Sequence, residues 1–202
     1  MISKTRAVES ELRSRGKAIE GLIGSLQDAR SKADTDALTG LSNRRAFERQ
    51  LGATFERAKQ SGNVSTLAIC DIDRFKLIND NFGHQTGDRV IQFVADSLAY
   101  NCGDRGHVFR FGGEEYVILF ENVGCSEARE CIERAMQDLA ARNFVHSKTN
   151  KPIGAVTFSC GLSETGSFKD PGSLLGSADR ALYEAKASGR NCIKEGSADD
   201  TN

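Results

Sequence analysis

Two apolar, β-prone segments flank a pair of glycines in Val108-Phe109-Arg110-Phe111-Gly112-Gly113-Glu114-Glu115-Tyr116-Val117-Ile118-Leu119-Phe120. This pattern predicts a β-hairpin whose turn is Gly-Gly. Glycine allows a positive φ and lets a ligand approach the backbone closely. The two carboxylates that follow suit a hard cation carrying phosphates. The stretch therefore predicts a sheet with a candidate metal site at one end of a strand.

Helices and further strands are predicted on both sides of this hairpin. Helices are expected over 41–59, 86–98, 126–141 and 173–188, and strands over 65–71, 155–162 and 191–194. Ser126 and Ser173 are expected N-caps, and Gly189 is expected at the C′ position of the last helix. Because helices alternate with strands but a hairpin intervenes, we expect a mixed or antiparallel sheet with helices on its faces.

Residues 1–33 predict one helix outside the globular domain. Its seam follows alternating steps of four and three from Val8 to Ala33, which is typical of a parallel coiled-coil stalk. The alternative is a lone amphipathic helix packed on its own domain. Arg15 in the seam and three glycines favour that alternative, since each helical glycine costs about 1 kcal/mol relative to alanine. We favour the dimeric stalk, and we expect a disordered tail over 196–202.

Composition limits the class of protein. The chain has 202 residues, 39% hydrophobic and 27% charged, with a net charge of −1. We therefore expect a globular, cytoplasmic protein with no nucleic-acid partner. No apolar run is long enough to span a bilayer and no signal-peptide pattern opens the chain, so no membrane contact is expected. The six cysteines lack metal spacing and are expected to be reduced core residues.

Four blocks, in one order and approximate spacing, resemble the GGDEF family, the diguanylate cyclases, which make cyclic di-GMP from two GTP. The blocks are residues 36–45, 71–80, the pentad 112–116 and 178–191. The pentad ends in Tyr116 where the family usually has Phe. The resemblance implies a cyclase domain over 34–195. It also implies an α+β fold, a ferredoxin-like, palm-type βαββαβ sheet flanked by helices.

The candidate metal ligands come from two neighbouring strands. Carboxylates at such positions can hold one or two Mg²⁺ ions, which would grip a triphosphate and lower the pKa of an attacking hydroxyl. A lone Asp-x-Asp at a strand end is otherwise typical of a solvated turn. The resemblance implies that Asp71 and Glu114 are the principal ligands, helped by the Ile72 carbonyl, with Mn²⁺ as a substitute for Mg²⁺. It implies a second-metal or substrate contact for Glu115, and Asp73 is a further candidate.

Candidate phosphate contacts lie just after the predicted strand 65–71 and near the end of the predicted helix 173–188. Backbone N–H groups around Phe75 and Lys76 could cradle phosphates, and Lys76 adds a charge. The resemblance assigns Lys186 and Arg190 to the substrate phosphates. The alternative for these two is that cations complement the dipole at a helix C-terminus. Arg110, before the hairpin turn, is a further candidate for a charge contact.

Asn79 and Asp88 are the candidate guanine contacts. An amide and a carboxylate match the O6 acceptor and the N1–H and N2–H₂ donors of guanine, and the carboxylate would reject adenine. The family uses both positions in this way. The alternative for Asp88 is that it caps the helix that follows.

One family feature is missing. Many diguanylate cyclases have an Arg-x-x-Asp motif before the pentad, which binds product and inhibits the enzyme. Gly103 and Gly106 occupy these positions here. We therefore expect no feedback inhibition through that site.

The favoured function is an active diguanylate cyclase that needs Mg²⁺ and works as a homodimer. Each protomer would bind one GTP, with the two active sites facing each other and the stalk setting their geometry. An upstream sensor domain, if one exists, would act through the stalk. The first alternative is a non-enzymatic module that binds GTP and engages a partner protein. The second is a nucleotide cyclase that makes a single-nucleotide cyclic product.

Overall fold

A computed structural model describes residues 33–146 and 151–197, together with Arg15, Ile19 and Gly21. The chain divides into two compact units, Met1–Thr35 and Asp36–Asn202. In the first unit, Arg15, Ile19 and Gly21 are helical and exposed. The rest of the predicted heptad seam lies outside the described residues, as does the predicted tail from position 198 onward. The site is built entirely in the second unit.

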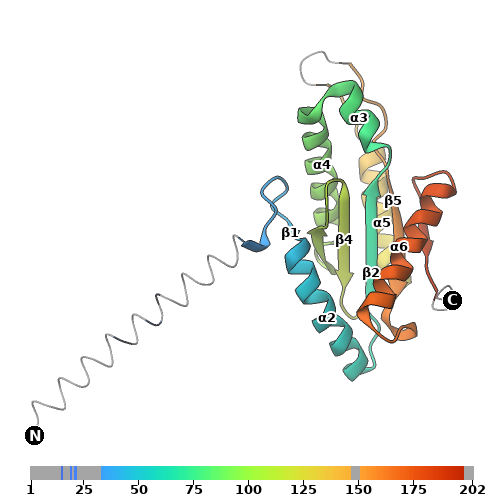
Figure 1. Cartoon of the computed structure of the whole chain (residues 1–202). Helices are drawn as coiled ribbons and strands as arrows, with labels where there is room; N and C mark the ends of the chain where they lie inside the picture. The colour runs from blue at the N-terminus through green and yellow to red at the C-terminus, as the bar shows by residue number, and fades with distance from the viewer. Residues whose placement is uncertain (1–14, 16–18, 20, 22–32, 147–150, 198–202) are drawn as a thin grey trace, which may run out of the picture. The chain divides into compact units, whose positions relative to one another are not determined.

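The described residues form one mixed sheet of six strands in the order β1-β3-β4-β2-β5-β6 (Figure 1). Strand β2 is antiparallel to both β4 and β5, and β3 is antiparallel to β4, whereas the outer strands β1 and β6 pair in parallel. The strands are β1 (Ser42–Asn43), β2 (Thr66–Ile72), β3 (Gly106–Arg110), β4 (Glu115–Phe120), β5 (Phe158–Glu164) and β6 (Ile193–Glu195). The predicted α+β fold with a βαββαβ core is confirmed.

Helices cover both faces of this sheet. One apolar core lies between the sheet and helices α4 and α5, and a second lies between the sheet and helices α2 and α6. The α-helices of the second unit are α2 (Arg44–Ser61), α3 (Phe75–Phe82), α4 (His84–Cys102), α5 (Cys125–Ala140) and α6 (Pro171–Ala187). Among the described residues, none of the helices has the length and apolar character needed to cross a membrane.

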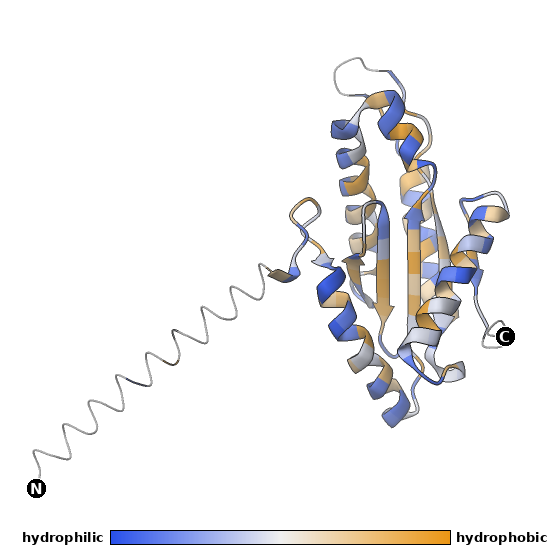
Figure 2. Ribbon diagram, in the orientation of Figure 1, coloured by the Kyte–Doolittle hydropathy of each residue, from blue (hydrophilic) through white to orange (hydrophobic). Residues whose placement is uncertain are grey.

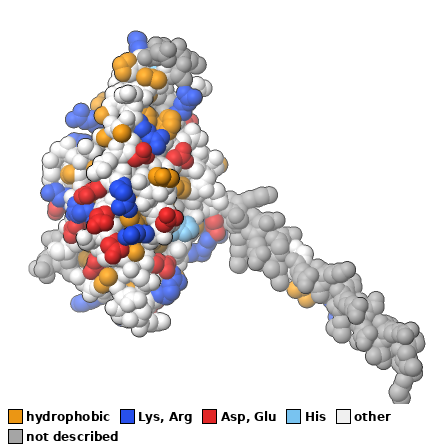
Figure 3. Space-filling model, turned by 180° about the vertical axis from the view of Figure 1, so that it is seen from behind, with side chains coloured by type: hydrophobic (Ala, Val, Ile, Leu, Met, Phe, Trp, Pro, Cys, Tyr) orange, Lys and Arg blue, Asp and Glu red, His pale blue; other side chains and the backbone are white. Residues whose placement is uncertain are grey.

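Strand β2 is buried on both sides because its side chains alternate between the two cores. Ala68, Cys70 and Ile72 face α4 and α5, whereas Leu67 and Ile69 face α2 and α6. Figure 2 shows the resulting apolar centre of the sheet inside helices with polar outer faces. Fully burying each large apolar side chain stabilises the fold by roughly 1.5–3 kcal/mol. On the face seen in Figure 3, acidic and basic side chains are interspersed.

Several predicted helix boundaries are wrong for local reasons. Helix α2 begins at Arg44 rather than at position 41, because residues 42 and 43 pair with β3 and the Asn43 side chain accepts from the Ala46 N–H. Helix α5 begins at Cys125 after Gly124, so Ser126 is not its N-cap. The N-cap of α6 is Asp170, whose carboxylate accepts from the Ser173 N–H.

The segment after β2 also differs from prediction. Helix α3 lies between the predicted strand and the predicted helix, where no helix is predicted, and only Gly83, with φ 80°, separates it from α4. Since α4 begins at His84, Asp88 lies in its second turn and does not cap it. By contrast, the predicted end of α6 is confirmed: Gly189 has φ 113°, and the Arg190 N–H donates to the Ala185 carbonyl at 3.1 Å.

Candidate functional site

Three acidic residues lie where β2 ends beside the β3–β4 hairpin. Asp71 is opposite Glu115 in the β2–β4 register, and the Ile72 N–H donates to the Glu114 carbonyl at 3.2 Å. Asp71 is 7% exposed, and the two glutamates are half-buried. Pairing of the two strands thus gathers acids that are distant in the sequence.

Lys186 is the cation nearest to this acidic edge. Its ammonium lies 2.9 Å from Asp71 Oδ2. Burial nevertheless raises the pKa of Asp71, with Lys186 opposing and Asp73 adding to the rise. Burial also raises the pKa of Glu114, and the charges of Asp71 and Glu115 raise it further. Burial, more than repulsion, therefore makes the ionised carboxylates costly, and Lys186 offsets only part of that cost.

The donor set fits a hard divalent cation. Asp71, Glu114 and Glu115 offer only oxygen atoms, which are the ligands that Mg²⁺ prefers. No three acidic, histidine or cysteine side chains among the described residues are already grouped as a metal cluster. A cation bound here would offset the cost of keeping Asp71 and Glu114 ionised in their buried surroundings.

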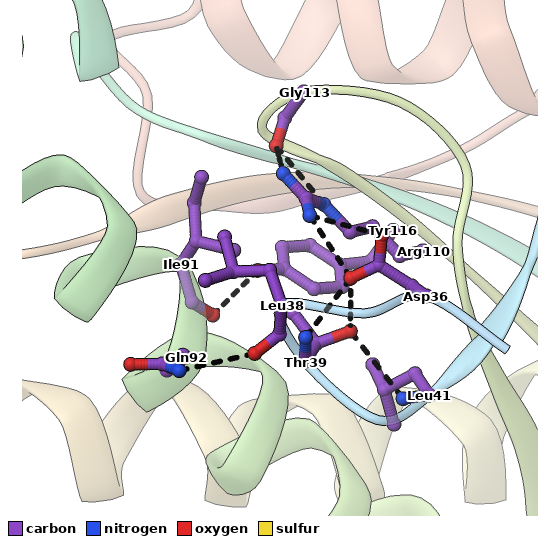
Figure 4. Close-up of polar contacts among 9 residues, drawn as sticks. All are labelled: Asp36, Leu38, Thr39, Leu41, Ile91, Gln92, Arg110, Gly113 and Tyr116. Carbon is purple, nitrogen blue, oxygen red and sulfur yellow. Dashed lines mark hydrogen bonds and ion pairs between the residues drawn. The ribbon is translucent and has the colours of Figure 1, made fainter. Parts of the chain in front are cut away.

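The hairpin turn is held by close packing and by an arginine. Neither Gly112 nor Gly113 has a positive φ. A Cβ at position 112 would lie 2.9 Å from Glu115 Oε2, so a larger residue there would displace the end of the Glu115 side chain. Arg110 donates from Nη2 to the Gly113 carbonyl at 2.8 Å and from Nη1 to Asp36 at 2.9 Å (Figure 4). The structure thus places Arg110 as a clamp on the turn.

Asp36 anchors that clamp. It accepts from the Thr39 N–H and hydroxyl at 2.9 and 2.8 Å, as well as from Arg110. Burial opposes its ionisation, but these hydrogen bonds outweigh burial and hold the pKa of Asp36 below its usual range. These contacts give Asp36 a turn-fixing role beside the hairpin.

Tyr116 joins the hairpin to helix α4. Its ring is fully buried, and its hydroxyl donates to the Ile91 carbonyl at 2.6 Å (Figure 4). One residue further along α4, Gln92 donates to the Leu38 carbonyl at 3.0 Å. The helix that carries Asp88 is therefore tied directly to β4, the strand that begins at Glu115.

Asn79 and Asp88 lie on consecutive helices. Asn79 Oδ1 is buried and has no hydrogen-bond partner among the described residues. It packs on Gly87, where a Cβ would lie 2.0 Å from that oxygen and 3.0 Å from Phe75 Cζ. Asp88, next to Gly87, is exposed. A buried acceptor without a donor costs free energy, so a ligand that donates to it would be favoured.

The candidate phosphate contacts lie at the start of α3 and at the end of α6. Helix α3 begins after Arg74, which has φ 55° and gives no side-chain cap. The N–H groups of Phe75 and Lys76 thus remain candidates for an anion, whereas the Leu77 N–H donates to the Arg74 carbonyl at 2.9 Å. Lys76 is exposed on this turn, and Arg190 is exposed just beyond α6.

Asp73 is engaged within the protein. Its carboxylate accepts from Thr157 Oγ1 and Ser159 Oγ, both at 2.7 Å, and from the Asn191 N–H at 3.0 Å. Asp73 is 8% exposed. No sequence motif singles out Thr157 and Ser159. Ser159 lies in β5 and Thr157 immediately precedes it, so their period-two spacing could have indicated that both point to the same side.

A model of the family described as "Diguanylate cyclase, GGDEF domain" matches residues 33–192. The diguanylate cyclase DgcP of Pseudomonas aeruginosa is 38% identical over 169 residues, which are 84% of this chain and 25% of that protein. The chain thus spans a quarter of the length of that relative.

Two solved structures of GGDEF-type domains share the fold of this chain. The coiled coil and GGDEF domain of DgcB from Caulobacter crescentus, in complex with c-di-GMP, has a TM-score of 0.84 at 34% identity, covering 93% of this chain and 98% of that one. The active GGEEF domain of a diguanylate cyclase from Vibrio cholerae has a TM-score of 0.70 at 34% identity, covering 77% and 97%.

Proposed function

Since this chain belongs to the diguanylate cyclase GGDEF family, we propose that it condenses two GTP into cyclic di-GMP and releases two pyrophosphates. The observation that carries the proposal is the group of mutually repelling carboxylates, Asp71, Glu114 and Glu115, at the ends of two paired strands. Phosphoryl transfer requires charge neutralisation and alignment, which such a group supplies with a cation.

The metal would be held by Asp71, Glu114 and the Ile72 carbonyl. A bound Mg²⁺ or Mn²⁺ would neutralise the triphosphate and lower the pKa of the attacking 3′-hydroxyl. Glu115 is proposed as a second ligand or a substrate contact. Its carboxylate packs against Gly112, where a Cβ would occupy part of the space that the carboxylate uses.

The triphosphate would lie between the start of α3 and the end of α6. Backbone N–H groups at Phe75 and Lys76, with the side chains of Lys76, Lys186 and Arg190, supply hydrogen bonds and positive charge. Lys186 would exchange Asp71 for a phosphate when the cation occupies the carboxylates. The exchange leaves no buried charge without a partner.

The guanine base would lie at Asn79 and Asp88. The buried Oδ1 of Asn79 can accept from a base N–H, and the Asp88 carboxylate can accept from N1–H or N2–H₂. Adenine presents a different pattern of donors on this edge. The proposed site thus prefers GTP to ATP.

Dimerisation belongs to the proposal because one domain aligns only one of the two nucleotides. The stalk over residues 1–33 would bring two domains together, and an upstream sensor would act on that geometry. Product inhibition through an Arg-x-x-Asp site is not expected. At Gly106, a Cβ would lie 2.7 Å from the Phe120 ring, so a larger side chain there needs repacking.

The alternative is a module that binds GTP without turning it over. The repelling carboxylates favour the enzyme, because base and phosphate recognition alone does not require three acids at one strand end.

The deciding experiment is to incubate the purified chain with GTP and Mg²⁺ and to identify the nucleotide product by mass spectrometry. Cyclic di-GMP with two pyrophosphates per product supports the enzyme. Binding of GTP without product supports the module, and a cyclic mononucleotide would refute the diguanylate reaction. Deleting residues 1–33 should make specific activity rise more steeply with protein concentration, and micromolar cyclic di-GMP should inhibit the full chain only weakly.

A further inference from the structure

The turn after α6 has an uncommon backbone. Gly189, Arg190 and Asn191 have φ values of 113°, 68° and 48°. Two consecutive residues with side chains are thus left-handed, a conformation that L-residues disfavour. Such a conformation persists only where neighbouring contacts hold it, and it often marks a functional position.

Two hydrogen bonds hold this turn at successive residues. The Arg190 N–H donates to the Ala185 carbonyl at 3.1 Å, which is the usual closure of a helix end. The Asn191 N–H donates to Asp73 Oδ2 at 3.0 Å. Asp73 is 118 residues away in the sequence and lies just beyond the end of β2, two residues after Asp71. This hydrogen bond therefore fixes the position of the turn relative to β2, the strand that carries Asp71.

Neighbouring hydroxyls fix the direction of the Asp73 carboxylate. Ser159 donates to Oδ1 and Thr157 to Oδ2, both at 2.7 Å. Both oxygens thus have partners in the protein, and the side chain is nearly buried. This arrangement favours an acceptor for the turn over a ligand for a metal.

We propose that Asp73 is a positioning residue that fixes the 189–191 turn and thereby aims Arg190 at the substrate triphosphate. The inference rests on the proposed function, in which Arg190 contacts phosphate. Asp73 touches neither substrate nor metal in this view. Its effect passes through the Asn191 N–H to the neighbouring arginine.

A double-mutant cycle tests this coupling. The readout is equilibrium binding of guanosine 5′-[(α,β)-methyleno]triphosphate in Mg²⁺, an analogue whose bridge blocks cleavage. Arg190→Ala and Asp73→Ala should each weaken binding by about ten-fold, the loss expected for one charge-assisted hydrogen bond. The double variant should bind within about two-fold of Arg190→Ala, because Asp73 acts through Arg190.

Two conservative variants separate positioning from charge or folding. Asp73→Asn keeps an oxygen for the Asn191 N–H and should bind within about three-fold of wild type. Ser159→Ala is the matched control, because it removes a bond to Oδ1 but leaves Oδ2 with the turn. It should lower the melting temperature and leave analogue binding within about two-fold. The Mg²⁺ concentration for half-maximal binding should stay the same in Asp73→Ala.

The outcomes distinguish the inference from the function on which it rests. Multiplicative losses in the double variant, a ten-fold loss in Asp73→Asn or a changed Mg²⁺ requirement would each overturn the positioning role. Wild-type binding by Asp73→Ala would overturn it too. If Arg190→Ala alone binds normally, the phosphate role of Arg190 fails instead. If Asp73→Ala does not fold, the Asp73→Asn and Ser159→Ala comparisons still decide.

Discussion

The ammonium of Lys186 lies 2.9 Å from Asp71 Oδ2, where α6 passes the end of β2. The lysine is the nearest cation to a site that, on our proposal, must hold both a metal and a triphosphate. In the metal-free protein it partly neutralises the acidic edge. This contact must therefore change when substrate and metal bind.

Lys186→Met tests that exchange. We expect turnover at saturating Mg²⁺ to fall by about 10²-fold or more, because a charged contact to the phosphates is lost. The Mg²⁺ concentration for half-maximal activity should fall, since the lysine no longer competes for Asp71. Lys59→Met, in the last turn of α2, is the matched control and should leave both quantities unchanged. A higher Mg²⁺ requirement would contradict the competition.

Glu114→Gln should abolish product formation while stabilising the metal-free fold. The amide cannot offset the charge of a metal-bound triphosphate, but it ends the repulsion from Asp71 and Glu115. The melting temperature without metal should therefore rise or stay constant. Millimolar Mg²⁺ should raise the melting temperature of the wild type and not that of the variant, because ligands that bind only the native state stabilise it. Near wild-type turnover would refute the assignment of Glu114.

The pH profile follows from burial and repulsion at the same carboxylates. The pKa of Asp71 lies above its ordinary value of 3.8 and that of Glu114 above 4.5. Because both must be ionised to hold a cation, the acid limb of kcat/KM at subsaturating Mg²⁺ should lie above the ordinary carboxyl range. An acid limb at pH ~4 would show unperturbed carboxyls instead.

The same pKa values fix the sign of the stability change without metal. As the pH falls through the raised native pKa, the native state gains protons before the unfolded state does. Protonation of these two groups therefore raises the free energy of unfolding as the pH falls, and their ionisation lowers it as the pH rises. Asp71→Asn/Glu114→Gln should flatten this part of the melting profile in EDTA.

Asp88→Ser should weaken GTP use and admit ATP. The variant loses the carboxylate that accepts from guanine and would repel the acceptor N1 of adenine, at a cost of about 1–3 kcal/mol for the unpaired partner. The measurement is kcat/KM for both nucleotides. Asp96→Ser, an exposed change farther along α4, is the control. Unchanged GTP kinetics with continued exclusion of ATP would place the guanine contact elsewhere.

Tyr116→Phe tests the bond between the hairpin and α4. The family's usual phenylalanine keeps the ring but removes the donor to the Ile91 carbonyl. We expect the free energy of unfolding to fall by about 1 kcal/mol. KM for GTP should rise while kcat changes little, because this hydrogen bond fixes the position of α4, the helix that carries Asp88. Denaturant titration and steady-state kinetics check both, and a fall in kcat alone would contradict this reading.

The stretch around Gly112 and Gly113 shows that local sequence is enough to predict the hairpin. Apolar flanks and two glycines are sufficient to predict the hairpin, because strand pairing on each side is short-range. The motif blocks also bring Asp71, Glu114 and Glu115 into one hypothesis. The helix starts at His84 and Pro171 were missed, because a capping residue depends on backbone conformation that several neighbouring residues can satisfy.

The sequence by itself determined the family, most of the strands and helices, and which residues have the chemistry for a cation, phosphates and guanine. Only the tertiary structure decided how those residues are used. In the folded chain, Lys186 forms an ion pair with Asp71, and Arg110 donates to Asp36 and to the Gly113 carbonyl. The Asn191 N–H donates to Asp73. The physical reason is that sheet pairing and helix packing set distances between residues far apart in the chain. A charged or polar side chain then takes whichever partner lies within reach.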